Sequence, residues 1–213
     1  MPRKEREIKL RRQYIVDVAQ ELFKKYGYEN TSMDDIAKES EFSKTTLYKY
    51  FKSKEELSIY VYRKIHLEKM AVLRSFIDKG KTGADKLYQF AQAYIKFFAE
   101  NPDALRFQLA WDYKGINKEI ISKEQVEEIF SSYDYDFVYL NDIIVLGKKD
   151  GSFREDLDNE AVLDTYYLLL RSLLNQMLFI KNNNNTVSSL FVDERSSYDS
   201  FVEIFIKGLK PGI

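Results

Sequence analysis

Two short helical patterns separated by a tight turn occupy residues 31–54, and they constrain the fold more than any other feature of the chain. The first begins at Ser32, which with Asp35 three residues later forms an acidic variant of the capping box. The second begins at Ser43, a favoured N-cap residue, and turns Leu47 inward. Two capped helices joined this closely predict a helix-turn-helix, whose second helix enters the major groove of double-stranded DNA.

A longer helical pattern precedes this motif. Its apolar positions recur at helical spacing and are Ile15, Val18, Ala19, Leu22, Phe23 and Tyr26. Gly27 follows and predicts a left-handed stop. Beyond the motif, Ser53 and Glu56 form a capping box that predicts the start of another helix. The motif is therefore expected to lie in a three-helix domain near the N-terminus.

The outer face of the second short helix is expected to carry Lys44, Thr45, Tyr48 and Lys49. All four can donate hydrogen bonds to phosphate oxygens, and lysine and threonine can also contact base edges. A lysine on a surface helix is often only a solvated charge, and Tyr48 or its neighbour Tyr50 could be partly buried instead. Because hydroxyls, lysines and a tyrosine converge on one short helix, the pattern favours a DNA interface.

The same run resembles the DNA-binding domain of the TetR family of transcriptional repressors, whose usual pattern is T-x-x-x-I-A-x-x-A-G-V-S-x-x-T-L-Y-x-Y-F-x-S-K-E-x-L. The matching residues are Thr31 or Ser32, Ile36-Ala37, Ser43, Thr46-Leu47-Tyr48, Tyr50-Phe51 and Ser53-Lys54-Glu55-Glu56-Leu57. The family's Ala-Gly in the turn is replaced here by Ser40-Glu41. If the turn requires a positive φ, Glu41 carries strain that glycine would avoid.

The resemblance implies an all-α protein with a helix-turn-helix DNA-binding domain in residues 1–53 and a helical effector-binding and dimerisation domain in residues 54–213. The DNA-binding residues that it implies are Ser32, Ser43, Lys44, Thr45, Thr46, Tyr48, Lys49, Tyr50 and Lys54. The phosphate anchors would be Ser32, Tyr48, Tyr50 and Lys54. The base contacts would come from Lys44, Thr45 and Lys49, and Thr46 could make either kind of contact.

The charge of the chain is unevenly divided. Residues 1–65 hold 15 Lys/Arg against 11 Asp/Glu, whereas the other residues hold 18 against 23, so a net charge of −1 hides a basic N-terminal part. The basic residues at the start of the chain are Arg3, Lys4, Arg6, Lys9, Arg11 and Arg12. They predict an N-terminal arm that follows phosphates or reaches into the minor groove, unless the terminus is frayed and only aids solubility.

The rest of the chain is expected to form further helices without strand pairing, at residues 54–79, 84–99, 103–113, 122–147, 159–180 and 197–209. In the TetR family this region binds a small-molecule effector. Most of its aromatic residues should be ordinary core, but a subset could line an apolar pocket with tyrosine hydroxyls that orient a ligand. The candidates are Tyr94, Phe98, Phe107, Trp111, Phe137 and Tyr166. Such a lining suits an apolar or amphipathic effector.

The helices at 159–180 and 197–209 are the candidate dimer interface, because the first is apolar over more than one stripe. The candidate contact residues are Leu169, Leu170, Leu173, Met177, Phe201 and Phe205. The alternative is a helix buried entirely within its own chain. A homodimer would set two recognition helices roughly 34–36 Å apart, or a multiple of that, and so would need a near-palindromic operator.

Other classes of protein fit the sequence poorly. The chain has no cysteine and only one histidine, His66, and it lacks glycine-rich nucleotide motifs, so neither an enzyme, a cofactor nor a metal site is expected. The longest apolar stretch is broken by Arg171 and is too short to span a membrane, and the charged N-terminus resembles no signal peptide, so a cytoplasmic location is expected. The alternative to a ligand-responsive repressor is a helical adaptor that uses the motif for protein contacts.

Overall fold

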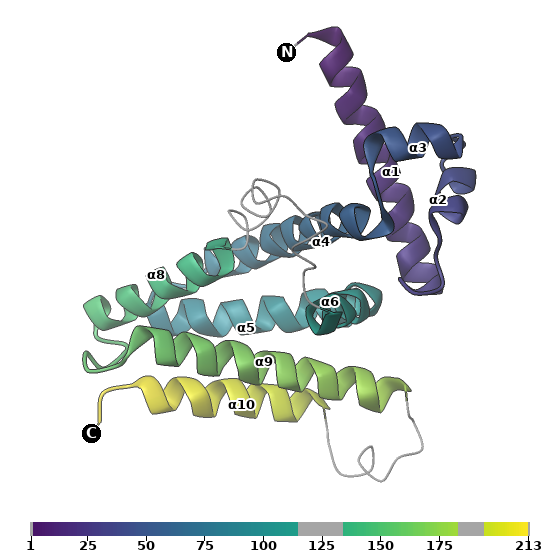
Figure 1. Cartoon of the computed structure of the whole chain (residues 1–213). Coiled ribbons are helices and arrows are strands. Elements are labelled where there is room, and N and C mark those ends of the chain that lie inside the picture. The colour runs from purple at the N-terminus through teal and green to yellow at the C-terminus, as the bar shows by residue number, and fades with distance from the viewer. Residues whose placement is uncertain (1, 115–133, 183–193, 213) are drawn as a thin grey trace. The chain divides into compact units, whose positions relative to one another are not determined.

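The computed structural model describes the backbone of residues 2–114, 134–182 and 194–212, and the side chains of residues 2–111, 138–176 and 198–212. In this part the chain is all-α, as predicted, and contains no strand (Figure 1). The helices are α1 (Arg3–Tyr26), α2 (Met33–Glu39), α3 (Lys44–Tyr50), α4 (Lys54–Ile77), α5 (Gly83–Glu100), α6 (Pro102–Lys114), α8 (Asp134–Asp150), α9 (Asn159–Asn182) and α10 (Glu194–Leu209). The start of the helix predicted at 122–147 lies outside the described residues. No described helix has the length and apolarity needed to cross a membrane.

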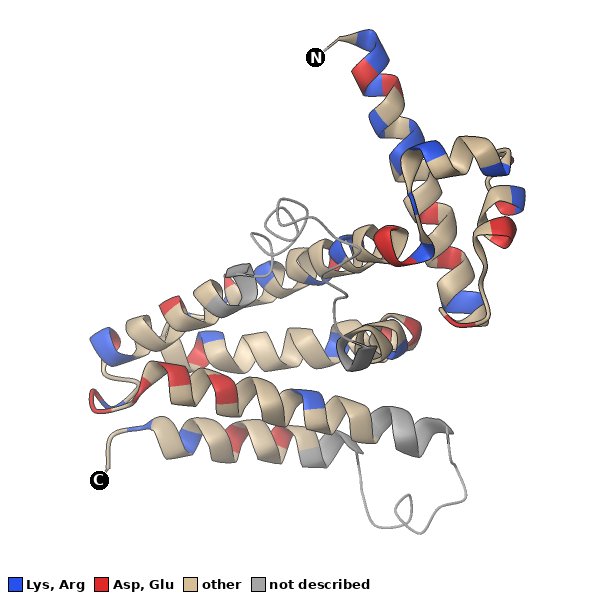
Figure 2. Ribbon diagram, in the orientation of Figure 1, with Lys and Arg blue, Asp and Glu red and all other residues tan. Residues whose placement is uncertain are grey.

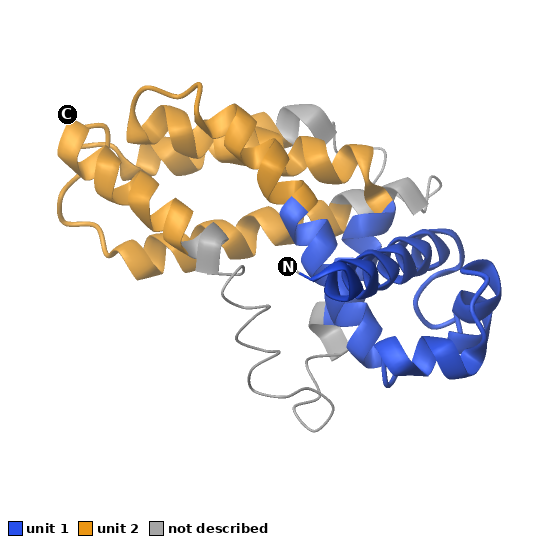
Figure 3. Ribbon diagram, turned by 90° about the horizontal axis from the view of Figure 1, so that it is seen from above, with its two compact units in different colours: residues 1–67, 103–132 blue, residues 68–102, 133–213 orange. Residues whose placement is uncertain are grey.

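The chain divides into two compact units, one of residues 1–67 and 103–132 and the other of residues 68–102 and 133–213 (Figure 3). Helix α4 begins in the first unit and continues into the second. Helix α6 joins the first unit through aromatic packing, because Trp111 stacks on Tyr62 of α4 with ring centroids 4.2 Å apart. The first unit is thus larger than the predicted 1–53 domain, and the functional boundary at residue 53 stays a prediction.

The first unit is held by the buried face of α1 against α2, α3 and α4. The buried residues of α1 are Ile15, Val16, Ala19, Gln20, Leu22 and Phe23. The predicted face is shifted slightly, since Val18 is only half-buried and Tyr26, in the last turn, is exposed. Gly27 ends the helix with a positive φ of 84°, but its ψ of 155° lies outside the left-handed helical region. The basic N-terminus is helical from Arg3 and forms neither an extended nor a frayed arm.

The second unit is built around α5, which packs on α8, α9 and α10. Its N-terminus approaches α8 where both helices have glycine: a Cβ on Gly83 would lie 2.3 Å from the Cα of Gly147. Two N–H groups at the start of α5, which have no partner within the helix, donate to the end of α8 and the turn after it. The Gly83 amide donates to Asp150 Oδ2 at 2.7 Å and the Ala84 amide to Ser152 Oγ at 3.1 Å. These bonds fix the start of α5 to the connector between α8 and α9.

Candidate nucleic-acid interface

Helix α2 starts with the capping box that the sequence predicts. The Asp35 amide donates to Ser32 Oγ at 3.2 Å, and the Ser32 amide donates to Asp35 Oδ2 at 2.8 Å. The hydrogen bond from the Ser32 hydroxyl lowers the pKa of Asp35, so the carboxylate stays ionised at the positive end of the helix. The Ser32 hydroxyl donates its one proton to Asp35, so the predicted contact with a phosphate oxygen would require this proton to turn from Asp35 to the phosphate.

The turn between α2 and α3 has the strain expected from the replacement of glycine. Glu41 has a φ of 58°, and it is the sole non-glycine residue with a positive φ in the described part of the chain. The Phe42 amide donates to Ala37 O at 3.0 Å, and the Ser40 hydroxyl donates to Ile36 O at 2.6 Å. These bonds satisfy the last carbonyls of α2 and hold the left-handed residue in place. The turn thus contains a left-handed residue even though it lacks glycine.

Helix α3 presents a polar outer face on a buried apolar one. Ser43 caps it by accepting from the Thr46 amide at 3.2 Å, and Leu47 on the inner face is fully buried. The side chains that reach solvent are Lys44, Thr45, Tyr48 and Lys49. The orientation of the predicted recognition helix is therefore as expected, and its contacts with DNA stay a prediction.

Lys44 and Tyr50, which the sequence predicts to contact DNA, also have intramolecular partners. Lys44 Nζ lies 2.6 Å from Asp34 Oδ2 of α2, and this hydrogen bond raises the pKa of Lys44. Both side chains are more than half exposed, so a phosphate or a base could replace Asp34 at little cost. Tyr50 is half-buried, with its ring 6.3 Å from that of Phe42. The ring of Tyr50 has a packing role in addition to any contact with phosphate.

Lys54 has a structural role that the sequence does not reveal. Its ammonium donates to Tyr28 O at 2.9 Å and to Thr31 O at 3.0 Å, and it lies 4.3 Å from the centroid of the Tyr28 ring. The side chain thereby ties the start of α4 to the loop between α1 and α2. Two of the three N–H groups of the ammonium are thus occupied, and only the third is left for the predicted contact with phosphate.

Arg12, which the sequence placed in a basic arm, supports the end of α3 instead. Its guanidinium lies over the rings of Phe51 and Tyr60, at 4.9 Å and 4.4 Å from the centroids. Its Nη2 atom is 3.7 Å from Glu56 Oε1, and Glu56 Oε2 accepts from the Lys52 amide at 2.6 Å. The predicted capping box of α4 is thus partly different, because the Glu56 carboxylate bonds the amide of Lys52.

The first unit is therefore a helix-turn-helix DNA-binding unit, and the chain belongs to the class of transcriptional regulators rather than enzymes. The family model for bacterial regulatory proteins of the tetR family matches residues 15–61. The chain is 30% identical over 141 residues to IcaR, the negative transcriptional regulator of the biofilm operon icaADBC of Staphylococcus epidermidis; the match covers 64% of this chain and 73% of that protein. The chain belongs to the TetR family of bacterial transcriptional regulators.

The chain is also similar to regulators from other bacteria. The fatty acid metabolism regulator protein of Bacillus subtilis is 26% identical over 145 residues, which cover 68% of this chain and 71% of that protein. Among solved structures, the regulator FadR of Bacillus subtilis in complex with stearoyl-CoA has a TM-score of 0.70 at 20% identity, covering 92% of this chain and 98% of that chain. The ketosteroid regulator KstR2 of Mycobacterium tuberculosis has a TM-score of 0.63 at 18% identity, with coverages of 95% and 96%. These structures share the fold along most of the chain.

The six predicted effector residues do not all belong to one unit. Tyr94, Phe98 and Tyr166 are buried in the second unit, where the ring of Tyr94 lies 5.0 Å from that of Phe98. Phe107 and Trp111 pack in the first unit, and the side chain of Phe137 lies outside the described ones. Their role in effector binding stays a prediction.

The Tyr166 hydroxyl is already engaged. It donates to Leu87 O at 2.8 Å, and its complete burial raises the pKa of the phenol. The hydroxyl thus bonds the backbone of α5 in this conformation, and a role for Tyr166 in orienting an effector stays a prediction. The sequence also gave no sign of Lys69, which is 2% exposed with its ammonium 5.2 Å from the centroid of the Tyr94 ring.

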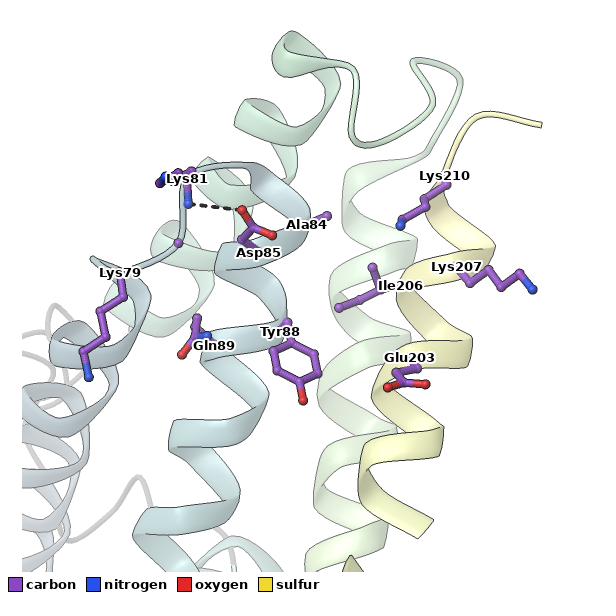
Figure 4. A pocket seen from close by; sticks show the side chains of 11 residues that line it. Lys79, Lys81, Ala84, Asp85, Tyr88, Gln89, Glu203, Ile206, Lys207 and Lys210 are labelled. Carbon is purple, nitrogen blue, oxygen red and sulfur yellow. Dashed lines mark hydrogen bonds between the residues drawn. The ribbon is translucent and has the colours of Figure 1, made fainter. Parts of the chain in front are cut away.

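A cavity of about 620 Å³ lies in the second unit between α5, α10 and the turn after α4 (Figure 4). Lysines contribute much of its lining, namely Lys79, Lys81, Lys207 and Lys210, with Asp85 and Glu203 as the acidic residues. None of the predicted effector residues lines it. The cavity is more polar than the pocket expected from the aromatic residues.

The predicted dimer residues divide by exposure. Leu170 is fully buried within its own chain, and its assignment to a dimer interface stays a prediction. Leu169 is 36% exposed, whereas its neighbour Leu168 is 65% exposed and Ile204 of α10 is 71% exposed. Leu173, Phe201 and Phe205 are half-buried, and the side chain of Met177 lies outside the described ones. The sequence did not single out the exposed Leu168, because a helix that is apolar on several sides does not indicate which face is solvated.

Proposed function

We propose that this protein is a homodimeric repressor that binds a near-palindromic operator through α3 and is released by a small apolar or amphipathic effector. The observation that carries the proposal is the outer face of α3, where Lys44, Thr45, Tyr48 and Lys49 are exposed on a helix whose inner face is fixed by Leu47 and Phe51. Cations and hydroxyls held on a rigid helix suit phosphate anchoring and base contacts in the major groove.

Dimerisation is supported by the solvated face of α9 and α10. Leu168, Leu169 and Ile204 are exposed apolar residues on two helices that pack on each other. The same pair of helices from a second copy would bury these side chains in an isologous four-helix bundle. Two-fold symmetry would then present two recognition helices to the two half-sites of an operator.

The effector proposal draws on the relatives. One similar structure holds stearoyl-CoA, and one similar sequence is a fatty acid metabolism regulator. The second unit of this chain has an aromatic interior, and α4 is continuous between the two units. An effector that prefers a conformer with α4 displaced would weaken operator binding about tenfold for each 1.4 kcal/mol of preference.

The test is a fluorescence-anisotropy titration of the full-length protein with duplexes from the DNA flanking its own gene. Selective binding that weakens steeply with salt supports the proposal, whereas equal weak binding to scrambled duplexes contradicts it. Lys49→Gln should weaken operator binding, and Lys38→Gln on α2 is the matched control because that lysine is also exposed. Calorimetric titration of a long-chain acyl-CoA with and without operator tests the coupling, since equal affinities would exclude it.

A further inference from the structure

The N-terminal part of α1 extends beyond the core of the first unit. Residues 2–11 are all exposed, and the first buried residue of the helix is Ile15. Figure 1 shows this stretch projecting past α2 and α3. Burial therefore does not explain why the helix begins at Arg3 rather than near Arg12.

The projecting stretch is basic, as the blue segments of α1 in Figure 2 show. Arg11 forms an ion pair with Glu7 at 2.7 Å on the helix surface. Arg3, Arg6 and Lys9 are spaced at i, i+3 and i+6, so at about 100° per residue they lie within an arc of roughly 120°. In the described part of the chain these three cations take part in no ion pair. They form a stripe of unpaired positive charge.

The helix that carries the stripe packs beside α3, three to five residues beyond Lys9. Arg12 lies over Phe51, the C-cap residue of α3, and the ring of Tyr14 is 6.3 Å from that of Phe42, just before the N-cap. Residues 12 and 14 of α1 thus pack on residues that flank α3 on either side. From Arg12 the helix runs nine residues to Arg3, a rise of about 13.5 Å. That length corresponds to about four successive phosphates of one DNA strand.

We infer that Arg3, Arg6 and Lys9 form a second DNA contact, which neutralises backbone phosphates next to the segment that α3 occupies. The inference rests on the proposed function. A membrane surface fits the stretch less well, because Ile8 and Leu10 are exposed but lie about 200° apart on the helix and form no apolar face. The contact adds affinity without selecting a sequence, since phosphates are the same at every base pair.

The experiment compares the salt dependence of DNA binding by the full-length protein and a variant with Arg3→Gln, Arg6→Gln and Lys9→Gln. Glutamine has nearly the helix propensity of arginine and lysine, and circular dichroism checks that the helix persists. The matched control carries Lys81→Gln, Lys149→Gln and Lys210→Gln, which remove the same charge from exposed positions of the second unit. Each protein is titrated with the operator duplex and a scrambled duplex over a series of salt concentrations.

The triple variant should lose about 2–3 units per protomer from the slope of log affinity against log salt, and its affinity should fall roughly tenfold on both duplexes. The control should keep the wild-type slope. An unchanged slope in the triple variant overturns the inference. The inference is also overturned if the wild type binds phosphatidylserine vesicles, the triple variant does not, and both proteins have the same salt slope on DNA. Absence of operator preference in the wild type would instead contradict the proposed function, while the slopes on scrambled DNA would still decide whether the stripe contacts phosphates.

Discussion

The guanidinium of Arg12 lies over the ring of Phe51, so a cation of α1 packs on the residue that ends α3. The same guanidinium contacts Tyr60 and approaches Glu56, whose carboxylate bonds the amide of Lys52. One side chain therefore connects α1, the end of α3 and the start of α4. The orientation of the outer face of α3 depends on this connection.

Replacement of Arg12 by glutamine should lower the stability of the protein by about 1 kcal/mol, because two cation–π contacts and a partly screened ion pair are lost. Operator affinity should fall more than affinity for scrambled DNA, since a less fixed α3 loses base contacts before phosphate contacts. Arg11→Gln is the control, as Arg11 pairs only with the exposed Glu7. Thermal unfolding and anisotropy titrations give both quantities, and equal losses on the two duplexes would argue against a positioning role.

Replacement of Gly147 by alanine should destabilise the second unit by about 3 kcal/mol, because the added Cβ would overlap the buried ring of Phe153, which has no free space to move into. The added Cβ would lie 2.0 Å from a ring carbon of Phe153. Gly208→Ala is the matched control, since its Cβ would meet nothing within 4 Å and the helical site favours alanine. Denaturant unfolding should separate the two variants clearly, and similar midpoints would contradict the predicted clash.

Replacement of Glu41 by glycine should stabilise the protein by roughly 0.5–1 kcal/mol, because the strain of a positive φ at a residue with a side chain is removed. Glu39→Gly at the last position of α2 should instead destabilise it, by roughly 0.5 kcal/mol, because glycine costs less at a helix end than in the interior. The melting temperatures should therefore shift in opposite directions. A lower melting temperature for Glu41→Gly would mean that the side chain of Glu41 makes a stabilising interaction that outweighs its strain.

Leu168→Glu and Ile204→Glu should each convert the proposed dimer into a monomer, because a charge in the centre of an apolar interface is left unpaired. Val145→Glu on α8 serves as the control, as Val145 is 49% exposed and lies outside α9 and α10. Sedimentation equilibrium gives the masses. A dimeric Leu168→Glu protein would place the interface elsewhere.

The capping box of α2 should make part of the stability depend on pH. Hydrogen bonds with Ser32 lower the pKa of Asp35 in the folded protein, so this contribution is complete above the unfolded pKa of about 3.9 and is lost as pH falls through the lower folded pKa. Asp35→Asn should therefore flatten the acid limb of the stability curve. Thermal unfolding over an acidic pH series measures this, with Asp164→Asn as a control at an exposed position of α9.

Local features could be predicted from the sequence because their causes lie within a few residues of one another. The caps at Ser32 and Ser43 and the positive φ at Glu41 depend on side-chain and backbone groups three to five positions apart. The all-α class follows from the same caps and from the spacing of apolar residues. The TetR resemblance came from this local pattern too.

The tertiary structure decided which of these side chains were left for function. The sequence could not show that Lys54 bonds the carbonyls of Tyr28 and Thr31, or that Arg12 packs on Phe51, because those partners lie tens of residues away. Nor could it distinguish buried Leu170 from exposed Leu168 on a helix that is apolar on several sides. Periodicity identifies an apolar face, but only packing against neighbouring helices determines which part of that face remains in contact with solvent.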